Sequence, residues 1–103
     1  MVKVLLRTIQ EIQPGKWDEL EELDKEFNEI EYEKYKYPKK RRYRLLTGIN
    51  NTNTLIVERV WESMRKMENV MEESAFDPDL MKLNEKLNDI MIRAWNEIYM
   101  VME

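Results

Sequence analysis

The residues that could perform chemistry in this chain are carboxylates, guanidinium groups and aromatic rings, because the sequence contains no histidine and no cysteine. Histidine is the commonest general base, and cysteine supplies thiolate nucleophiles and zinc ligands. A Ser-His or Cys-His catalytic pair and a His-ligated haem are therefore excluded within this sequence. Any reaction has to use Asp, Glu, Lys, Arg, Tyr, Ser, Thr or groups on the substrate itself.

Charged side chains interrupt stretches in which apolar residues otherwise alternate; these charges are Arg7, Arg44, Glu58 and Arg59. A buried charge is costly unless it is paired. Such charges could bind a carboxylate or phenolate or move a substrate proton; alternatively, they pair across strands or between two chains, or lie at sheet edges. Glu58 is the only strand carboxylate in the middle of an apolar run. We therefore expect Glu58, with Arg59 beside it, to be the candidate catalytic residues.

Aromatic rings accompany these charges on the expected strands. Tyr43, Trp61, Trp95 and Tyr99, together with Arg7, could line a pocket for a flat organic molecule. The alternative is that the rings are ordinary core or dimer packing. Neither cofactor nor metal ligation is expected, since no diagnostic ligand spacing is present.

A basic run precedes and enters the second expected strand; its members are Lys39, Lys40, Arg41, Arg42 and Arg44. This run could bind nucleic acid or phosphate. Alternatively, it is a charged edge strand that prevents sheet-to-sheet aggregation. The net charge of −4, from 17 basic and 21 acidic residues, opposes general nucleic-acid binding. The edge strand is therefore the favoured interpretation.

The elements that must position these residues follow from changes in hydrophobic period. Apolar residues alternate over 2–12, 42–49, 54–61 and 92–102, and recur at helical spacing over 16–35 and 64–91. A Gly/Asn turn over 48–53 separates the two middle strands. Pro14 is expected in the first turn of the first helix, and Asp77 is expected to cap a helix that starts at Pro78. The acidic helix positions Glu19, Glu22, Glu26, Glu29 and Glu33 are expected to form a solvated face.

The resulting order of strand, helix, strand, strand, helix, strand predicts one α+β domain over residues 1–103. Right-handed crossovers place four antiparallel strands in one sheet with both helical regions on one face. The strands carry apolar residues on both sides, so the other face also needs a cover. A second copy of the chain is the simplest cover.

Several short motifs carry a resemblance to a known superfamily. They are Pro14-Gly15-Lys16-Trp17, Trp61-Glu62-Ser63, Asp77-Pro78-Asp79-Leu80 and Trp95-Asn96-Glu97-Ile98-Tyr99. With the order of elements, they resemble the ferredoxin-like dimeric α+β barrel superfamily, especially its NIPSNAP-like, EthD-like and antibiotic-biosynthesis-monooxygenase-like members. The resemblance implies a homodimer whose two sheets form a barrel, and a ligand cleft between each sheet and its helices.

The activities known in that superfamily are diverse. Its haem-degrading members rely on a histidine that this chain lacks. Its cofactor-free oxygenases use Trp, Asn, Tyr and Arg around the substrate, and this chain has those residue types without a one-to-one match. The resemblance therefore leaves open whether the chain is an enzyme.

The sequence supports three functional hypotheses. The first is a cytoplasmic homodimer that binds a small apolar or aromatic molecule between sheet and helices. The second is a cofactor-independent monooxygenase or isomerase acting on a small aromatic substrate. The third is a protein or nucleic-acid interaction module that uses the basic run. A membrane association is not expected, since no run approaches 18 apolar residues.

Overall fold

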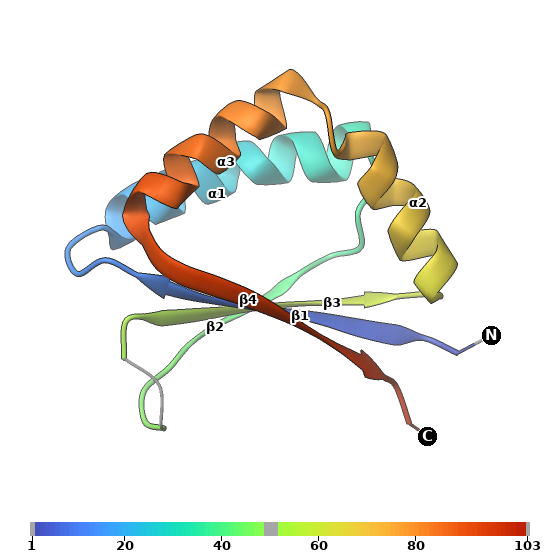
Figure 1. The fold of residues 1–103 in the computed structure, drawn as a ribbon, viewed down its shortest axis with the longest axis horizontal. Helices are drawn as coiled ribbons and strands as arrows, with labels where there is room; N and C mark the ends of the chain where they lie inside the picture. The colour runs from blue at the N-terminus through green and yellow to red at the C-terminus, as the bar shows by residue number, and fades with distance from the viewer. Residues whose placement is uncertain (1, 49–51, 103) are drawn as a thin grey trace.

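The computed structural model describes residues 2–48 and 52–102, and its centre is a four-stranded antiparallel sheet covered on one face by helices (Figure 1). The elements in chain order are β1 (Val4–Ile12), α1 (Trp17–Asn28), the π-helical turn η1 (Glu29–Lys34), β2 (Arg41–Arg44), β3 (Thr54–Trp61), α2 (Met64–Ser74), α3 (Pro78–Ile90) and β4 (Met91–Met100). The strand order in the sheet is β2-β3-β1-β4. The predicted α+β, ferredoxin-like arrangement of this chain is therefore confirmed.

The first helical region covers nearly the whole predicted range 16–35 but changes its winding. It begins at Trp17 after a turn at Pro14 and Gly15, where Gly15 adopts a positive φ of 82°. Pro14 thus lies in the turn, not in the first turn of the helix as predicted. Beyond Asn28 the helix continues as η1 and stops at Lys34, followed by Lys36 at a φ of 58°.

The second strand is shorter than the predicted range 42–49 and lies closer to the N-terminus. β2 covers only Arg41–Arg44, opposite Leu55 to Glu58 of β3. Strand pairing ends at Arg44, and beyond it the Leu45 amide donates a hydrogen bond to the Thr54 carbonyl at 3.0 Å. The predicted turn over 48–53 lies partly outside the described residues.

The second helical region consists of two helices, each with a side-chain cap. The Ser63 hydroxyl accepts a hydrogen bond from the Lys66 amide at the start of α2. Asp77 accepts from the amides of Asp79 and Leu80 at the start of α3, which confirms the predicted N-cap before Pro78.

The strand register assigns every strand residue to one of two faces. Leu6 pairs with Arg59 of β3 and with Ile98 of β4, and Thr8 pairs with Val57. Directly paired residues project to the same side, and successive residues project to opposite sides. We call the side of the sheet with Leu6, Val57 and Arg59 the helix face. The neighbouring residues along each strand project to the opposite side, which we call the open face.

Two apolar clusters hold the helices on the helix face. One joins Leu20 and Leu23 of α1 to Leu55 and Leu83. The other joins Val4 and Leu6 to Trp61, Met67 and Val70, and so anchors α2. None of the helices in the described ranges combines the length and apolarity that a bilayer crossing requires.

Candidate functional site

A cavity of about 320 Å³ lies between the helix face of the sheet and the helices. Leu6 and Val57 belong to its sheet side, Leu23 and Phe27 come from α1, and Leu80 comes from α3. Apolar side chains suit these positions, because a polar group buried there without a hydrogen-bond partner would cost free energy. These side chains form the apolar part of the cavity lining.

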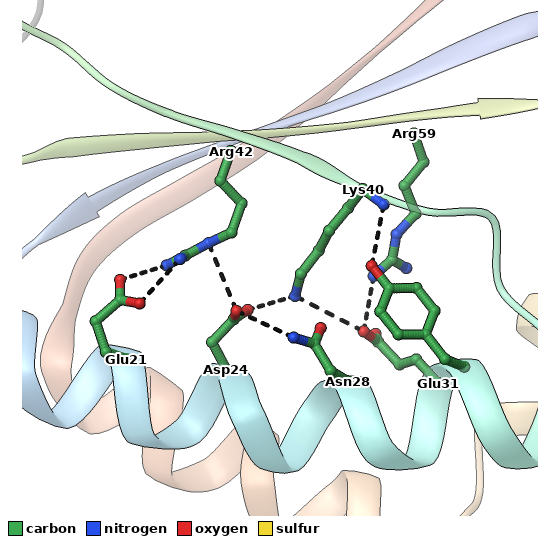
Figure 2. Close-up of polar contacts among 8 residues, drawn as sticks. Glu21, Asp24, Asn28, Glu31, Lys40, Arg42 and Arg59 are labelled. Atoms are coloured by element: carbon green, nitrogen blue, oxygen red, sulfur yellow. Dashed lines mark hydrogen bonds and ion pairs between the residues drawn. The ribbon is translucent and has the colours of Figure 1, made fainter.

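Charged side chains line part of the same cavity. They come from four segments: Asp24 from α1, Glu31 from η1, Lys40 from the segment before β2, and Arg59 from β3. Figure 2 shows them reaching toward one another between α1 and the chain that leads into β2. The cavity thus combines an apolar lining with one group of fixed charges.

The charges in the cavity are paired with one another. The Lys40 ammonium donates to Asp24 and lies 4.0 Å from Glu31 Oε1. Arg59 Nη2 donates to Glu31 Oε1 at 2.7 Å. Because all four side chains are largely buried, each charge depends on its opposite for stabilisation.

A second pair extends this network to the surface (Figure 2). Arg42 of β2 donates two hydrogen bonds to Glu21, at 3.0 and 2.7 Å, and its Nε lies 3.7 Å from Asp24 Oδ2. The hydrogen bond from Arg42 lowers the pKa of Glu21, and the same bond raises the pKa of Arg42. Two cations of the basic run, Lys40 and Arg42, thus bind acids of the first helical segment.

The Tyr37 ring makes a cation–π contact with the Arg59 guanidinium. Arg59 Cζ lies 4.8 Å from the Tyr37 ring centre, a distance at which a cation interacts with an aromatic face. The Tyr37 hydroxyl lies 2.6 Å from Ser74 Oγ, and burial raises the pKa of the phenol. The ring also packs edge-on against Trp61, with centroids 5.5 Å apart.

The structure separates the two residues that we expected to act together in catalysis. Arg59 lines the cavity, whereas Glu58 is the adjacent residue of the same strand and projects to the open face. There Glu58 lies 3.5 Å from Arg7, which is also 3.9 Å from Glu97. Glu58 therefore takes part in a cross-strand ion pair, and the sheet lies between it and the cavity.

The residues expected to line a pocket are also divided between the faces. By register, Arg7, Tyr43, Trp95 and Tyr99 belong to the open face. Trp61 belongs to the helix face and is 1% exposed, but its ring packs in the α2 cluster and is not part of the cavity lining. The structure thus does not bring these five side chains into one site.

The sequence analysis missed the charged residues of the cavity that lie on the first helical segment. The helical spacing of Leu20, Asp24, Phe27 and Glu31 could have revealed them, since steps of four, three and four place residues on one helix face. The five glutamates expected to be solvated occupy other positions and are exposed. In the described part of the chain, no three acidic groups are arranged to hold a metal ion.

The strand order, the crossover helices and the cavity beneath them define a ferredoxin-like α+β domain. No family model matches the chain, and no curated protein matches its sequence. Solved structures do match its fold, and they are similar to the chain over nearly its whole length.

Two NIPSNAP proteins illustrate this similarity. One is a NIPSNAP family protein from Agrobacterium tumefaciens strain C58, with a TM-score of 0.80, 17% identity, and coverage of 98% of this chain and 87% of that one. The other is an uncharacterised NIPSNAP domain protein from Burkholderia xenovorans, with a TM-score of 0.80, 12% identity, and coverage of 96% and 94%.

A third structure, from Nitrosomonas europaea, is provisionally named an antibiotic biosynthesis monooxygenase. It matches with a TM-score of 0.65 and 11% identity, over 97% of this chain and 90% of that one. At such identities the similarity concerns the fold. The predicted resemblance of this chain to NIPSNAP-like and monooxygenase-like proteins is therefore confirmed for the fold.

Proposed function

We propose that this chain binds a small, largely apolar molecule in the cavity between its sheet and its helices. The observation that supports this function is the cavity itself, a space of about 320 Å³ that both apolar side chains and fixed polar groups line. Small-molecule sites typically have this combination, with volumes from roughly 300 Å³ upward. The apolar lining supplies affinity, and the polar groups orient the ligand.

Binding of the neutral dye N-phenyl-1-naphthylamine tests this function, because its fluorescence rises in an apolar environment. We expect the wild-type chain to bind the dye at a saturable site. Val57→Phe should abolish most of the binding, since Val57 lines the cavity and a phenyl ring would occupy it. Absence of saturable binding by the wild-type chain would refute the proposal.

Ile56→Phe is the matched control for that experiment. It introduces the same ring one residue away on β3, but on the open face. Dye binding by Ile56→Phe should equal that of the wild type. If both variants lost binding equally, the dye would be reporting on general stability and not on the cavity.

We also propose that two chains associate through their open faces. This face carries partly exposed apolar side chains, including Tyr43, Val60 and Tyr99, around the Arg7 ion pairs. Because it carries both signs of charge next to apolar groups, the face can be complementary to a copy of itself about a two-fold axis. Light scattering should give the mass of two chains at micromolar concentration, and the mass of one chain would contradict this assembly.

The second candidate function is cofactor-independent oxygenation or isomerisation of a bound aromatic molecule. The similarity in fold to the provisionally named monooxygenase favours it. In the cavity, the carboxylates available to accept a proton are Asp24 and Glu31. Glu58 lies on the other face, so we assign the proton-accepting role in this alternative to Glu31, which is in contact with Arg59.

A further inference from the structure

We propose that the cavity selects an uncharged ligand whose carbonyl oxygen, as in a ketone, ester or amide, accepts a hydrogen bond from Arg59. A carboxylate of the same shape would be bound more weakly. This inference rests on the proposed ligand-binding function and adds the polar group that the ligand carries.

The first argument is the balance of charge around the cavity. Asp24 and Glu31 are matched by Lys40 and Arg59, and the adjoining Glu21 is matched by Arg42. An anionic ligand would add a negative charge beside two carboxylates that are already buried. Because an unmatched charge in such a place is costly, the network favours a ligand that leaves the balance unchanged.

The second argument is an unused hydrogen-bond donor. The Arg59 side chain is only 9% exposed, and one of its terminal nitrogens donates to Glu31. Its Nε is buried and has no acceptor among the residues that the structure describes. The guanidinium carries five N–H donors, and its other terminal N–H groups are not engaged by Glu31, so a ligand oxygen beside Arg59 in the cavity can accept from one of them. Hydrogen bonds from a charged donor are also stronger than neutral ones.

This unused donor distinguishes Arg59 from the other buried groups without partners. Arg42 Nε and Asn28 Oδ1 also lack a hydrogen-bond partner, but neither side chain lines the cavity. Arg7 and Trp61 are likewise outside the lining. Across residues 2–48 and 52–102, the buried polar atom without a hydrogen-bond partner that belongs to a cavity-lining residue is therefore on a donor group, and its complement is an acceptor oxygen.

Three probes with one aromatic body test the inference. They are the propionyl ketone of dimethylaminonaphthalene (prodan), the analogue with a carboxylate in place of the ketone, and the analogue with a propyl group. Each is titrated at neutral pH with the wild-type chain and followed by its fluorescence. We expect the ketone to bind about tenfold more tightly than the carboxylate, as one good hydrogen bond and an avoided buried charge imply.

Arg59→Lys isolates the hydrogen bond from the charge. Lysine keeps a cation opposite Glu31 but lacks the additional N–H donors of the guanidinium, so this variant should bind the ketone about tenfold more weakly. Its affinity for the propyl analogue should be unchanged. Arg65→Lys on the exposed surface of α2 is the matched control and should leave all three affinities unchanged.

The possible outcomes separate this inference from the proposed function. If the wild-type chain bound the carboxylate as tightly as the ketone, the selection would be refuted without any variant having to fold. If Arg59→Lys weakened the ketone and the propyl analogue equally, the hydrogen bond would be refuted. Binding of all three probes with one affinity, blocked by Val57→Phe, would refute the selection but support the cavity. Failure of all three to bind would refute both.

Discussion

At the scale of single residues, Asp77 is the carboxylate at which two distant segments meet. Its Oδ1 accepts from the amides of Asp79 and Leu80, at 2.9 and 3.2 Å. Its Oδ2 accepts from the Lys34 ammonium at 2.6 Å and from the Tyr35 hydroxyl at 2.5 Å. The hydrogen bonds from Lys34 and Tyr35 hold the pKa of Asp77 well below its ordinary range. One side chain thus caps α3 and ties it to the end of η1.

The lowered pKa of Asp77 predicts a loss of stability in acid. A carboxyl whose pKa is lower in the folded chain contributes stability above its unfolded pKa of about 4, and loses it as the pH falls below that value. Asp77→Asn keeps a capping side chain but loses the charge that faces Lys34. We expect this variant to have a lower melting temperature at neutral pH and a shallower decline between neutral pH and strong acid.

Circular dichroism melts across that pH range provide the measurement. Asp79→Asn, which changes an exposed neighbour in the first turn of α3, is the control and should keep the wild-type slope. Parallel melting curves for wild type and Asp77→Asn would show that the Asp77 charge does not stabilise the fold.

At the scale of elements, charge holds β2 beside α1. β2 has only four residues and its side chains are mostly exposed, so it contributes little apolar burial of its own. Lys40 and Arg42 instead bind Asp24 and Glu21 of α1. The basic run is located at the edge of the sheet, as the favoured interpretation expected, and two of its cations are bound within the fold.

Removing one member of this network should lower the free energy of unfolding more than removing both members of an ion pair. Asp24→Leu leaves the buried Lys40 ammonium without its nearest partner, so we expect a loss of about 3 kcal/mol in the free energy of unfolding. The double variant Asp24→Leu with Lys40→Leu should regain most of that loss, because apolar residues can replace a buried pair at little cost.

Urea unfolding measures both effects. Glu22→Leu alters an exposed carboxylate of the same helix and should change the stability by less than about 0.5 kcal/mol. If the double variant were no more stable than Asp24→Leu alone, the two side chains would not act as a pair.

At the scale of the whole molecule, the open face decides how chains associate. Val60 on that face and Met81 on α3 are each 48% exposed in the single chain. A lysine at either position should therefore have a similar effect on the stability of an isolated chain. In the proposed dimer, Val60→Lys places a cation in the interface and should reduce the mass measured by light scattering to that of one chain. Met81→Lys should keep the mass of two chains, and equal masses for both variants would contradict the proposed interface.

The same separation of faces explains which parts of the site could be predicted from the sequence. Alternation along β3 and the capping motif at Asp77 are local patterns, and the strand and the helix start were correctly predicted from them. Glu58 and Arg59 were grouped because they are neighbours in sequence. In a strand, that proximity guarantees opposite faces. The charges that do share the cavity are separated by up to 35 residues, from Asp24 to Arg59, and no local period connects α1 with β3.

The sequence by itself determined the order of strands and helices, because hydrophobic period and capping residues act over a few positions. It also determined which chemistry is excluded, since that depends only on the residue types present. The tertiary structure alone decided which face of the sheet the helices cover, and therefore that Arg59, and not Glu58, faces the cavity. It also paired Lys40 and Arg42 with α1, because long-range packing and ion pairing bring together residues whose spacing in the chain carries no signal.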